Sequence, residues 1–247
     1  NNKVGTGTGF VYKIDNNYGY IITNHHVISN SENIIVTNIS GAEAKAKLLG
    51  SDEYSDIAVL VVDKKYALKK IELGSSSNSE IGDTVFTVGS PLGKKYMGTV
   101  TKGILSGKER QVEVSLTNRS FIMEVLQTDA AINSGNSGGP IANSNGEVIG
   151  ITNMKLVSSG VEGMGFAIPI EDAIKYAEKL IETGKIERPV LGVGTLDTTD
   201  TLAMKMQYGF TIDESITEGA VVGYTQKGSV AEKAGLEKGD VITKFGD

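Results

Sequence analysis

The feature that most constrains the fold is a series of short apolar stretches, each bounded by turn-forming residues, that runs from residue 5 to about residue 168. β-branched and aromatic residues make up these stretches, and Gly, Asn, Ser or Asp separate them, which is typical of strands. The predicted strands cover residues 9–13, 18–23, 33–37, 58–62, 84–89, 147–152 and 165–168. Because no helical periodicity separates them, and because the 31 glycines allow many tight turns, antiparallel barrels or a sandwich are expected.

A helical pattern follows this region at residues 169–183, where apolar residues recur at i, i+3, i+4 and i+7. Pro169 suits the first turn of a helix, and Gly184 suits its C-terminal cap. We interpret residues 185–189 as a linker, which predicts two domains, 1–186 and 187–247, the second of them truncated. Its expected elements are strands at 190–193, 220–224 and 241–245 and a short helix at 229–234.

Composition excludes several classes of function. A formal net charge of −6 excludes nucleic-acid binding, which requires an excess of positive charge against the phosphate backbone. The longest fully apolar run, residues 57–62, is far shorter than the ~20 residues that span a bilayer. The absence of cysteine excludes thiolate catalysis and zinc–thiolate sites. The chain starts at Asn1 without a leader, which we interpret as a processed or trimmed fragment whose anchor segment is missing.

The strongest local signal for chemistry is the serine of the segment Gly135-Asn136-Ser137-Gly138-Gly139-Pro140. A nucleophilic serine needs an exposed, tightly turned backbone, and glycines on both sides permit that turn. They also let backbone N–H groups converge where a carbonyl oxygen becomes negative. The alternative is a flexible Gly/Ser loop, but the apolar residues on either side, 125–132 and 140–141, favour a tight connection within a barrel.

A serine nucleophile requires a base, and the two histidines of the chain, His25 and His26, are adjacent and follow a predicted strand. Surface histidines are the alternative. Asp56, at the start of an apolar strand, suits the third group that orients an imidazole, although it could also be a turn residue. The resulting order of His, Asp and Ser on a β-rich scaffold is that of chymotrypsin-type enzymes.

The segments TNHHV (23–27), SDIAVL (55–60) and GNSGGP (135–140) together resemble the HtrA/Deg family of chymotrypsin-fold serine proteases. The resemblance continues through residues 127–133 and 163–169, and residues 188–193 and 228–240 resemble the PDZ domain of that family. It implies a mostly β protein, a double six-stranded β-barrel at 1–186 followed by a partial PDZ domain at 187–247.

The resemblance also implies residue roles. His26 is the base, with His25 a bystander, Asp56 orients His26, and Ser137 is the nucleophile. The N–H groups of Gly135 and Ser137 form the oxyanion hole, and Asn136 shapes the turn. The predicted substrate pocket has Ala131 and Ile132 at its base and Thr152, Asn153, Met164, Gly165, Phe166 and Ala167 as walls. Since no carboxylate lies at that base, cleavage after small or medium aliphatic residues is expected; Met164 could equally be core.

Regulation and partners are expected from the same resemblance. Residues 107–120 are polar and weakly periodic, which predicts a long mobile loop. The resemblance implies that residues 106–120 correspond to a sensing loop, with 91–97 and 157–162 as its neighbours and 133–136 as the segment that flips. Ordinary surface loops are the alternative. Val190, Leu191, Gly192 and Val193 match the carboxylate-binding segment of a PDZ domain. The expected partners are unfolded proteins, peptide C-termini at the PDZ domain and two further copies in a homotrimer, but not nucleic acid.

The leading hypothesis is therefore an ATP-independent serine endopeptidase that degrades unfolded or misfolded proteins outside the cytoplasm. It would contact a membrane only through a segment missing from this chain. The alternative is a chaperone or peptide-binding scaffold whose triad is mostly inactive. Hydrolysis of small esters is disfavoured because Ser137 does not lie in a Gly-x-Ser-x-Gly elbow between a strand and a helix. No cofactor is expected, and no metal site, because adjacent histidines on a strand point apart.

Overall fold

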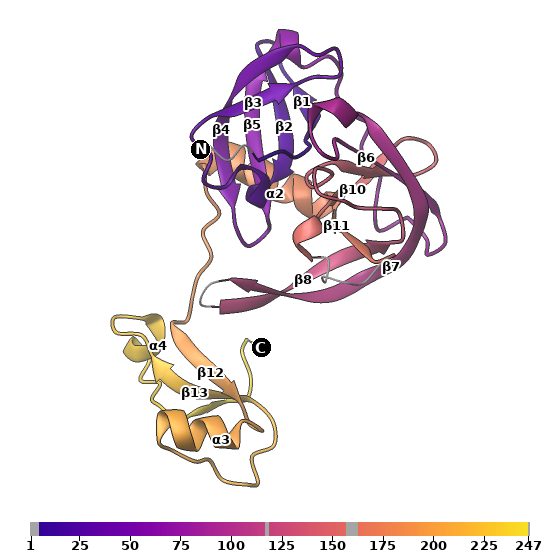
Figure 1. The fold of residues 1–247 in the computed structure, drawn as a ribbon. Coiled ribbons are helices and arrows are strands. Elements are labelled where there is room, and N and C mark those ends of the chain that lie inside the picture. The colour runs from indigo at the N-terminus through magenta and orange to yellow at the C-terminus, as the bar shows by residue number, and fades with distance from the viewer. Residues whose placement is uncertain (1–4, 117–118, 157–162, 247) are drawn as a thin grey trace. The chain divides into compact units, whose positions relative to one another are not determined.

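The computed structural model describes residues 5–116, 119–156 and 163–246, and it divides into two compact units, Asn1–Ile186 and Glu187–Asp247 (Figure 1). The segment 157–162, expected to be a neighbour of the sensing loop, lies outside the described residues. Within the part of the chain that the structure describes, no helix is both long enough and apolar enough to cross a bilayer.

The first half of unit 1 is a five-stranded antiparallel sheet in the order β1-β2-β5-β4-β3. Its strands are β1 (Phe10–Ile14), β2 (Tyr18–Asn24), β3 (Ile34–Thr37), β4 (Glu43–Asp52) and β5 (Ile57–Asp63). The polar hairpin between β1 and β2 forms because Asp15 Oδ1 accepts the N–H groups of Asn17 and Tyr18, at 2.8 and 2.7 Å. The expected closed barrel of six strands is corrected here: the described strands form an open sheet of five.

The second half of unit 1 is a closed six-stranded barrel in the order β10-β11-β8-β7-β6-β9. Its strands are β6 (Thr84–Gly89), β7 (Thr99–Leu116), β8 (Arg119–Thr128), β9 (Pro140–Ala142), β10 (Val148–Thr152) and β11 (Gly165–Pro169). β10 and β11 are buried along their whole length, as their nearly continuous apolar sequence indicates. A 3₁₀ turn, Met154–Leu156, follows β10.

The prediction of a long loop at 107–120 is wrong for the described residues, since 107–116 belong to β7 and 119–120 to β8, which pair as a hairpin. Val112 pairs with Met123 and Val114 with Phe121, while the residues between them face solvent. Inward-facing and solvent-facing residues do alternate here, but only two valines among charged residues mark the inward face, and bulges near Gly107 interrupt the pattern. The sequence does not predict β4 for a similar reason: its buried positions are Ala44, Ala46, Gly50 and Asp52, and alanine, glycine and aspartate have low β propensity.

The predicted helix is confirmed as α2 (Ile170–Thr183), which ends at Gly184 with φ +72°. Pro169 precedes the first turn as the N-cap instead of lying within it. The buried face of α2 joins a core to which both halves of unit 1 contribute; that core includes Phe10, Ile22, Val59, Ile151, Ile168, Ala173, Ala177 and Leu180. α2 therefore packs the sheet and the barrel against one shared interior.

Unit 2 contains a three-stranded antiparallel sheet of β12 (Val193–Asp197), β13 (Ala220–Thr225) and β14 (Val241–Ile242). Its helices are α3 (Thr201–Ala203), a π-helical turn at Met204–Tyr208, and α4 (Val230–Lys233). The strand predicted at 190–193 begins only at Val193, because Gly192 has φ +79° and interrupts the extended backbone. The strand predicted at 241–245 is likewise shorter, ending at Ile242.

Candidate active site

The two histidines lie on a helical turn, α1 (His25–Ile28), and not on a strand as expected. The turn begins where β2 ends, because two hydrogen bonds hold the backbone there against the Asp56 carbonyl oxygen. The buried Asn24 side chain and the His25 N–H both donate to the Asp56 carbonyl oxygen, each at 3.0 Å. In consequence His26 faces Asp56, while His25 Nδ1 lies 3.1 Å from Ser51 Oγ.

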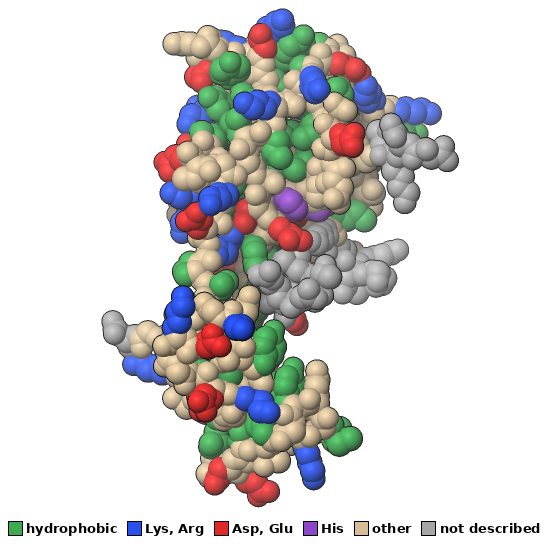
Figure 2. Space-filling model, turned by 90° about the vertical axis from the view of Figure 1, so that its left-hand side faces the viewer, with side chains coloured by type: hydrophobic (Ala, Val, Ile, Leu, Met, Phe, Trp, Pro, Cys, Tyr) green, Lys and Arg blue, Asp and Glu red, His purple; other side chains and the backbone are tan. Residues whose placement is uncertain are grey.

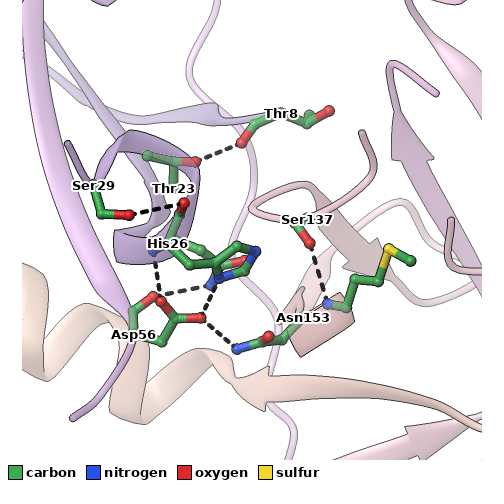
Figure 3. Close-up of polar contacts among 9 residues, drawn as sticks. Thr8, Thr23, His26, Ser29, Asp56, Ser137 and Asn153 are labelled. Atoms are coloured by element: carbon green, nitrogen blue, oxygen red, sulfur yellow. Dashed lines mark hydrogen bonds and ion pairs between the residues drawn. The ribbon is translucent and has the colours of Figure 1, made fainter. Parts of the chain in front are cut away.

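The Asp56 carboxylate is buried and is satisfied by three donors (Figure 3). Its Oδ1 accepts the His26 backbone N–H at 2.8 Å, and its Oδ2 lies 2.6 Å from His26 Nδ1. The same Oδ2 accepts the Asn153 side-chain amide at 2.8 Å. Asp56 itself has φ +52°, a conformation uncommon for a residue other than glycine, which this network holds in place. An imidazole that donates from Nδ1 to a carboxylate presents Nε2 as a proton acceptor.

Ser137 lies on a tight turn between β8 and β9, and the turn requires glycine. Asn136 N–H donates to the Asn133 carbonyl at 2.9 Å, and Gly135 has φ +102°. A side chain at Gly135 would place its Cβ 2.3 Å from the Ser90 carbonyl oxygen. A Cβ at Gly138, where φ is +82°, would lie 2.2 Å from the Thr8 carbonyl oxygen. The glycines thus serve both backbone conformation and close packing.

Ser137 and His26 line one open cavity of about 380 Å³, together with Gly135 and Met154. Figure 2 shows that the histidines (purple) reach the surface of the first unit. In this conformation Ser137 Oγ accepts a hydrogen bond from the Met154 N–H at 3.1 Å, and no hydrogen bond joins it to His26. Ser137 and His26 therefore line the same cavity, and no hydrogen bond joins their side chains.

The backbone of this turn also presents unused donors. The N–H groups of Asn136 and Gly138 bind the carbonyls of Asn133 and Thr152 at 2.9 Å each. The N–H groups of Gly135 and Ser137 donate to no oxygen of the described residues. Both of these residues line the cavity, so its wall can offer two hydrogen bonds to an oxygen with negative charge.

Comparison with known proteins identifies this arrangement. A family model described as a trypsin-like peptidase domain matches residues 7–151. Serine protease Do-like HtrB of Bacillus subtilis (strain 168) is 43% identical over 99% of the chain. The structure of the HtrA-type protease AlgW with a decapeptide superposes with a TM-score of 0.77 at 34% identity, covering 95% of this chain and 68% of that one. The chain belongs to the HtrA/Deg family of trypsin-like serine proteases.

A further HtrA/Deg relative is a probable periplasmic serine endoprotease, DegP-like, from Hahella chejuensis (strain KCTC 2396), which is 43% identical over 97% of this chain. The chain spans about half the length of the curated relatives it matches, 56% of HtrB and 48% of the DegP-like protein. The fold is mostly β and of the trypsin-like protease type, as the match to AlgW shows.

Within this HtrA/Deg fold, four residues expected to form pocket walls have their side chains in the interior. The Thr152 hydroxyl donates to the carbonyls of Asn136 and Gly139, at 2.6 and 3.1 Å, and Asn153 is bound to Asp56. Phe166 packs with Val125 and Leu156, and Ala167 lies in the barrel core. No part of the Thr152, Asn153 or Ala167 side chains reaches the surface, so only the backbone of these residues is available to a pocket wall. Their place in that wall stays a prediction.

The remaining pocket candidates lie nearer the surface. Ala131 and Met164 are exposed, and Ile132 is half-buried against Gly165, where an added Cβ would lie 2.7 Å from Ile132 Cδ1. Sequence reasoning missed two residues that contact the site, Asn153 as a partner of Asp56 and Thr8 as a partner of the Ser137 turn. Both contacts join segments distant in the chain, so no local pattern signals them.

The described residues contain no cluster of three or more His, Asp or Glu side chains with the spacing of a metal site. In unit 2, the carbonyls of Leu191 and Gly192 accept N–H groups from Ala231 and Gln226, at 2.9 and 2.8 Å. The Leu191 and Gly192 N–H groups donate to no described oxygen. These N–H groups belong to the segment predicted to bind a carboxylate.

Proposed function

We propose that this chain is a serine endopeptidase in which Ser137 is the nucleophile, His26 the general base and Asp56 the group that orients His26. The observation that carries the proposal is the buried Asp56 carboxylate, which binds His26 at both its backbone N–H and Nδ1 beside the cavity that Ser137 shares. Such a pair holds the imidazole in one tautomer and stabilises its charged form during the reaction.

The reaction follows from this geometry. When a peptide binds, the Ser137 hydroxyl turns from the Met154 N–H toward His26 and gives its proton to Nε2 as Oγ bonds to the peptide carbonyl carbon. The carbonyl oxygen becomes negative and accepts the N–H groups of Gly135 and Ser137, with Asn136 shaping the turn. His26 then protonates the leaving amine, the peptide bond breaks, and water attacks the acyl-enzyme by the reverse path.

The proposed substrates are unfolded or misfolded proteins, cut without ATP after small or medium aliphatic residues. Ala131, Ile132, Met164 and Gly165 carry no charge, and this favours an aliphatic side chain over Lys or Arg before the cut. The relatives named serine protease Do-like and periplasmic endoprotease support both the activity and an extracytoplasmic location.

We further propose that unit 2 acts as a PDZ domain, with Val190–Val193 receiving a peptide C-terminus, that the protein is a homotrimer, and that residues 106–120 act as a sensing segment. The unused N–H groups of Leu191 and Gly192 support capture of a carboxylate. The described residues of this segment lie on the hairpin of β7 and β8. A contact of the same hairpin supports a sensing role, because Phe121 on β8 packs against Tyr54, two residues before Asp56, with ring centroids 5.3 Å apart.

A second candidate function is a chaperone or peptide-binding scaffold whose triad is mostly inactive. One observation favours it: the Ser137 hydroxyl is bonded to the Met154 N–H and not to His26. A nucleophile held in this way reacts only after a change of conformation, whose population sets the observed rate.

The experiment that separates the two candidates is cleavage of unfolded casein, with the new termini determined by mass spectrometry. The chain is compared with Ser137→Ala and with a control, Ser144→Ala, which changes an exposed serine elsewhere in the barrel. Cuts after Val, Ala or similar residues that Ser137→Ala abolishes and Ser144→Ala keeps are expected. Equal cleavage by all three would exclude Ser137 as the nucleophile, and no cleavage by any, even with a C-terminal peptide added, would favour the scaffold.

A further inference from the structure

We propose that Thr8 is a positioning residue for the oxyanion site, and that its hydroxyl acts by holding the Gly135–Asn136 peptide in place. This inference rests on the proposed protease function and assigns a role to a residue outside the triad. Thr8 reaches the reacting atoms only through Gly135 and Ser137, so it does not touch the substrate itself.

Thr8 makes four hydrogen bonds around the nucleophile turn, and Figure 3 shows it beside Thr23. Its hydroxyl donates to the Gly135 carbonyl at 2.6 Å and accepts the Ser90 N–H at 3.0 Å. Its backbone N–H donates to the Ser137 carbonyl at 2.9 Å. Its own carbonyl accepts the Thr23 hydroxyl at 2.6 Å. One residue thus contacts both members of the turn whose N–H groups face the cavity.

The turn depends on this support because its own sequence supplies little rigidity. Glycine at positions 135, 138 and 139 leaves the backbone free to adopt several conformations. The Gly135–Asn136 peptide is held at both ends, its carbonyl by Thr8 and its N–H by the Asn133 carbonyl. The unused N–H groups belong to the peptides on either side of it, so a rotation here turns both donors away from the oxyanion position.

Thr8 also connects the base to the nucleophile. It precedes β1 in the half of unit 1 that carries His26, whereas Gly135 and Ser90 belong to the other half. Thr23, which bonds the Thr8 carbonyl, lies directly before Asn24, the N-cap of the α1 turn that holds His26. The same residue therefore sets the separation between the turn of Ser137 and the turn of His26.

The hydroxyl can be tested apart from the backbone of Thr8. Valine has nearly the shape of threonine, but its side chain cannot donate or accept a hydrogen bond. Thr8→Val therefore removes the 2.6 Å bond to the Gly135 carbonyl and the 3.0 Å bond from the Ser90 N–H, and leaves only the longer bond of 3.4 Å between these two groups. Serine keeps the hydroxyl. A matched control is Ser79→Ala, which removes another buried hydroxyl of unit 1, one that donates to the Ser75 carbonyl at 2.9 Å.

With a fluorogenic peptide cleaved by the wild-type chain, Thr8→Val is expected to lower kcat about tenfold and to change KM less than about twofold. Thr8→Ser should restore kcat to within about threefold of wild type, and Ser79→Ala should leave it unchanged. If Thr8→Val does not fold, Thr8→Ala replaces it with the same expected loss. A fall in melting temperature with unchanged kcat would overturn the proposal and leave Thr8 a structural residue.

A second readout does not depend on activity. Amide hydrogen exchange of residues 133–139, followed by mass spectrometry in the wild-type chain and in Thr8→Val, should be about tenfold faster in the variant and unchanged in Ser79→Ala. Unchanged exchange in Thr8→Val would overturn the inference even if the chain is an active protease. Faster exchange in a chain that cleaves nothing would contradict the proposed function while keeping Thr8 as the residue that holds the turn.

Discussion

The two halves of unit 1 contribute to the candidate site in different states. In the open sheet, the acid–base pair is complete, because Asp56 binds His26 through two atoms and Asn153 satisfies the carboxylate further. In the closed barrel, Ser137 is bonded to the Met154 N–H, and the two N–H groups beside it remain unused. His26 is therefore oriented mainly by Asp56 of its own half, with one further bond to Asp56 from Asn153 of the barrel. The Ser137 turn is not bonded to His26, and Thr8 of the sheet half holds its backbone.

Local structure explains this contrast. His26 lies on a helical turn fixed by the register of β2 and β5, in which Asn24 pairs with Ile57 directly after Asp56. Ser137 lies on a glycine-rich turn whose conformation the flanking strands do not specify. Substitutions near His26 in the sheet should therefore impair proton transfer. Substitutions near Ser137 in the barrel should instead lower the fraction of molecules whose turn has the conformation needed for the reaction.

The largest expected effect comes from breaking the pre-organised pair. Asp56→Asn replaces a carboxylate that accepts from His26 Nδ1 with an amide that can donate to it, so the imidazole adopts the wrong tautomer. We expect kcat to fall by about four orders of magnitude with the fold intact. The measurement is kcat on a fluorogenic peptide, with Asp63→Asn at the far end of β5 as the control. A loss of less than tenfold would mean that the pair does not orient the base.

A smaller effect distinguishes the two roles considered for Asn153. Asn153→Leu removes the amide that donates to Asp56 Oδ2 but keeps the volume of the side chain. If Asn153 positions Asp56, Asn153→Leu should lower kcat about tenfold and leave KM for aliphatic peptides unchanged. The full pH–rate profile of the variant should shift as well. A change in KM and in side-chain preference alone would instead support the predicted place of Asn153 in the pocket wall.

The smallest expected effect concerns a bond between α2 and the segment that joins the two halves. Burial raises the pKa of Glu171, but the hydroxyls of Ser76 and Ser75 and two backbone N–H groups bind its carboxylate and lower the pKa to a net value below 4.5. Because the folded pKa is the lower one, this stabilisation is present above pH 4.5 and is lost as pH falls through the folded pKa.

Glu171→Gln should therefore lower the free energy of unfolding at pH 7 by about 1 kcal/mol or less, since the carboxylate is only partly buried and solvent screens its interactions. It should also remove part of the acid destabilisation seen in the wild-type chain. Urea unfolding at pH 7 and at pH 3.5 measures both, with Glu182→Gln at the other end of α2 as the control. An unchanged difference between the two pH values would show that the bonds to Ser75 and Ser76 contribute nothing to stability.

The sequence by itself determined the β-rich first unit, the α2 helix and the family. It did so because alternating apolar residues, helix caps and glycine turns are local signals. It also limited the base to His25 or His26 and marked Ser137 by the glycines of its turn. The family resemblance then selected His26 from the two histidines. In the structure, His26 Nδ1 lies 2.6 Å from Asp56 Oδ2, and Ser137 lines the same cavity as His26.

Only the tertiary structure decided which residues support these three. Asn153 meets Asp56 across 97 positions of the chain, and Thr8 meets Gly135 across 127. The helical turn of the histidines and the long β7–β8 hairpin likewise depend on partners outside their own segments. A hydrogen bond between distant segments produces no periodic pattern in either segment, because its two partners come close only when the chain folds.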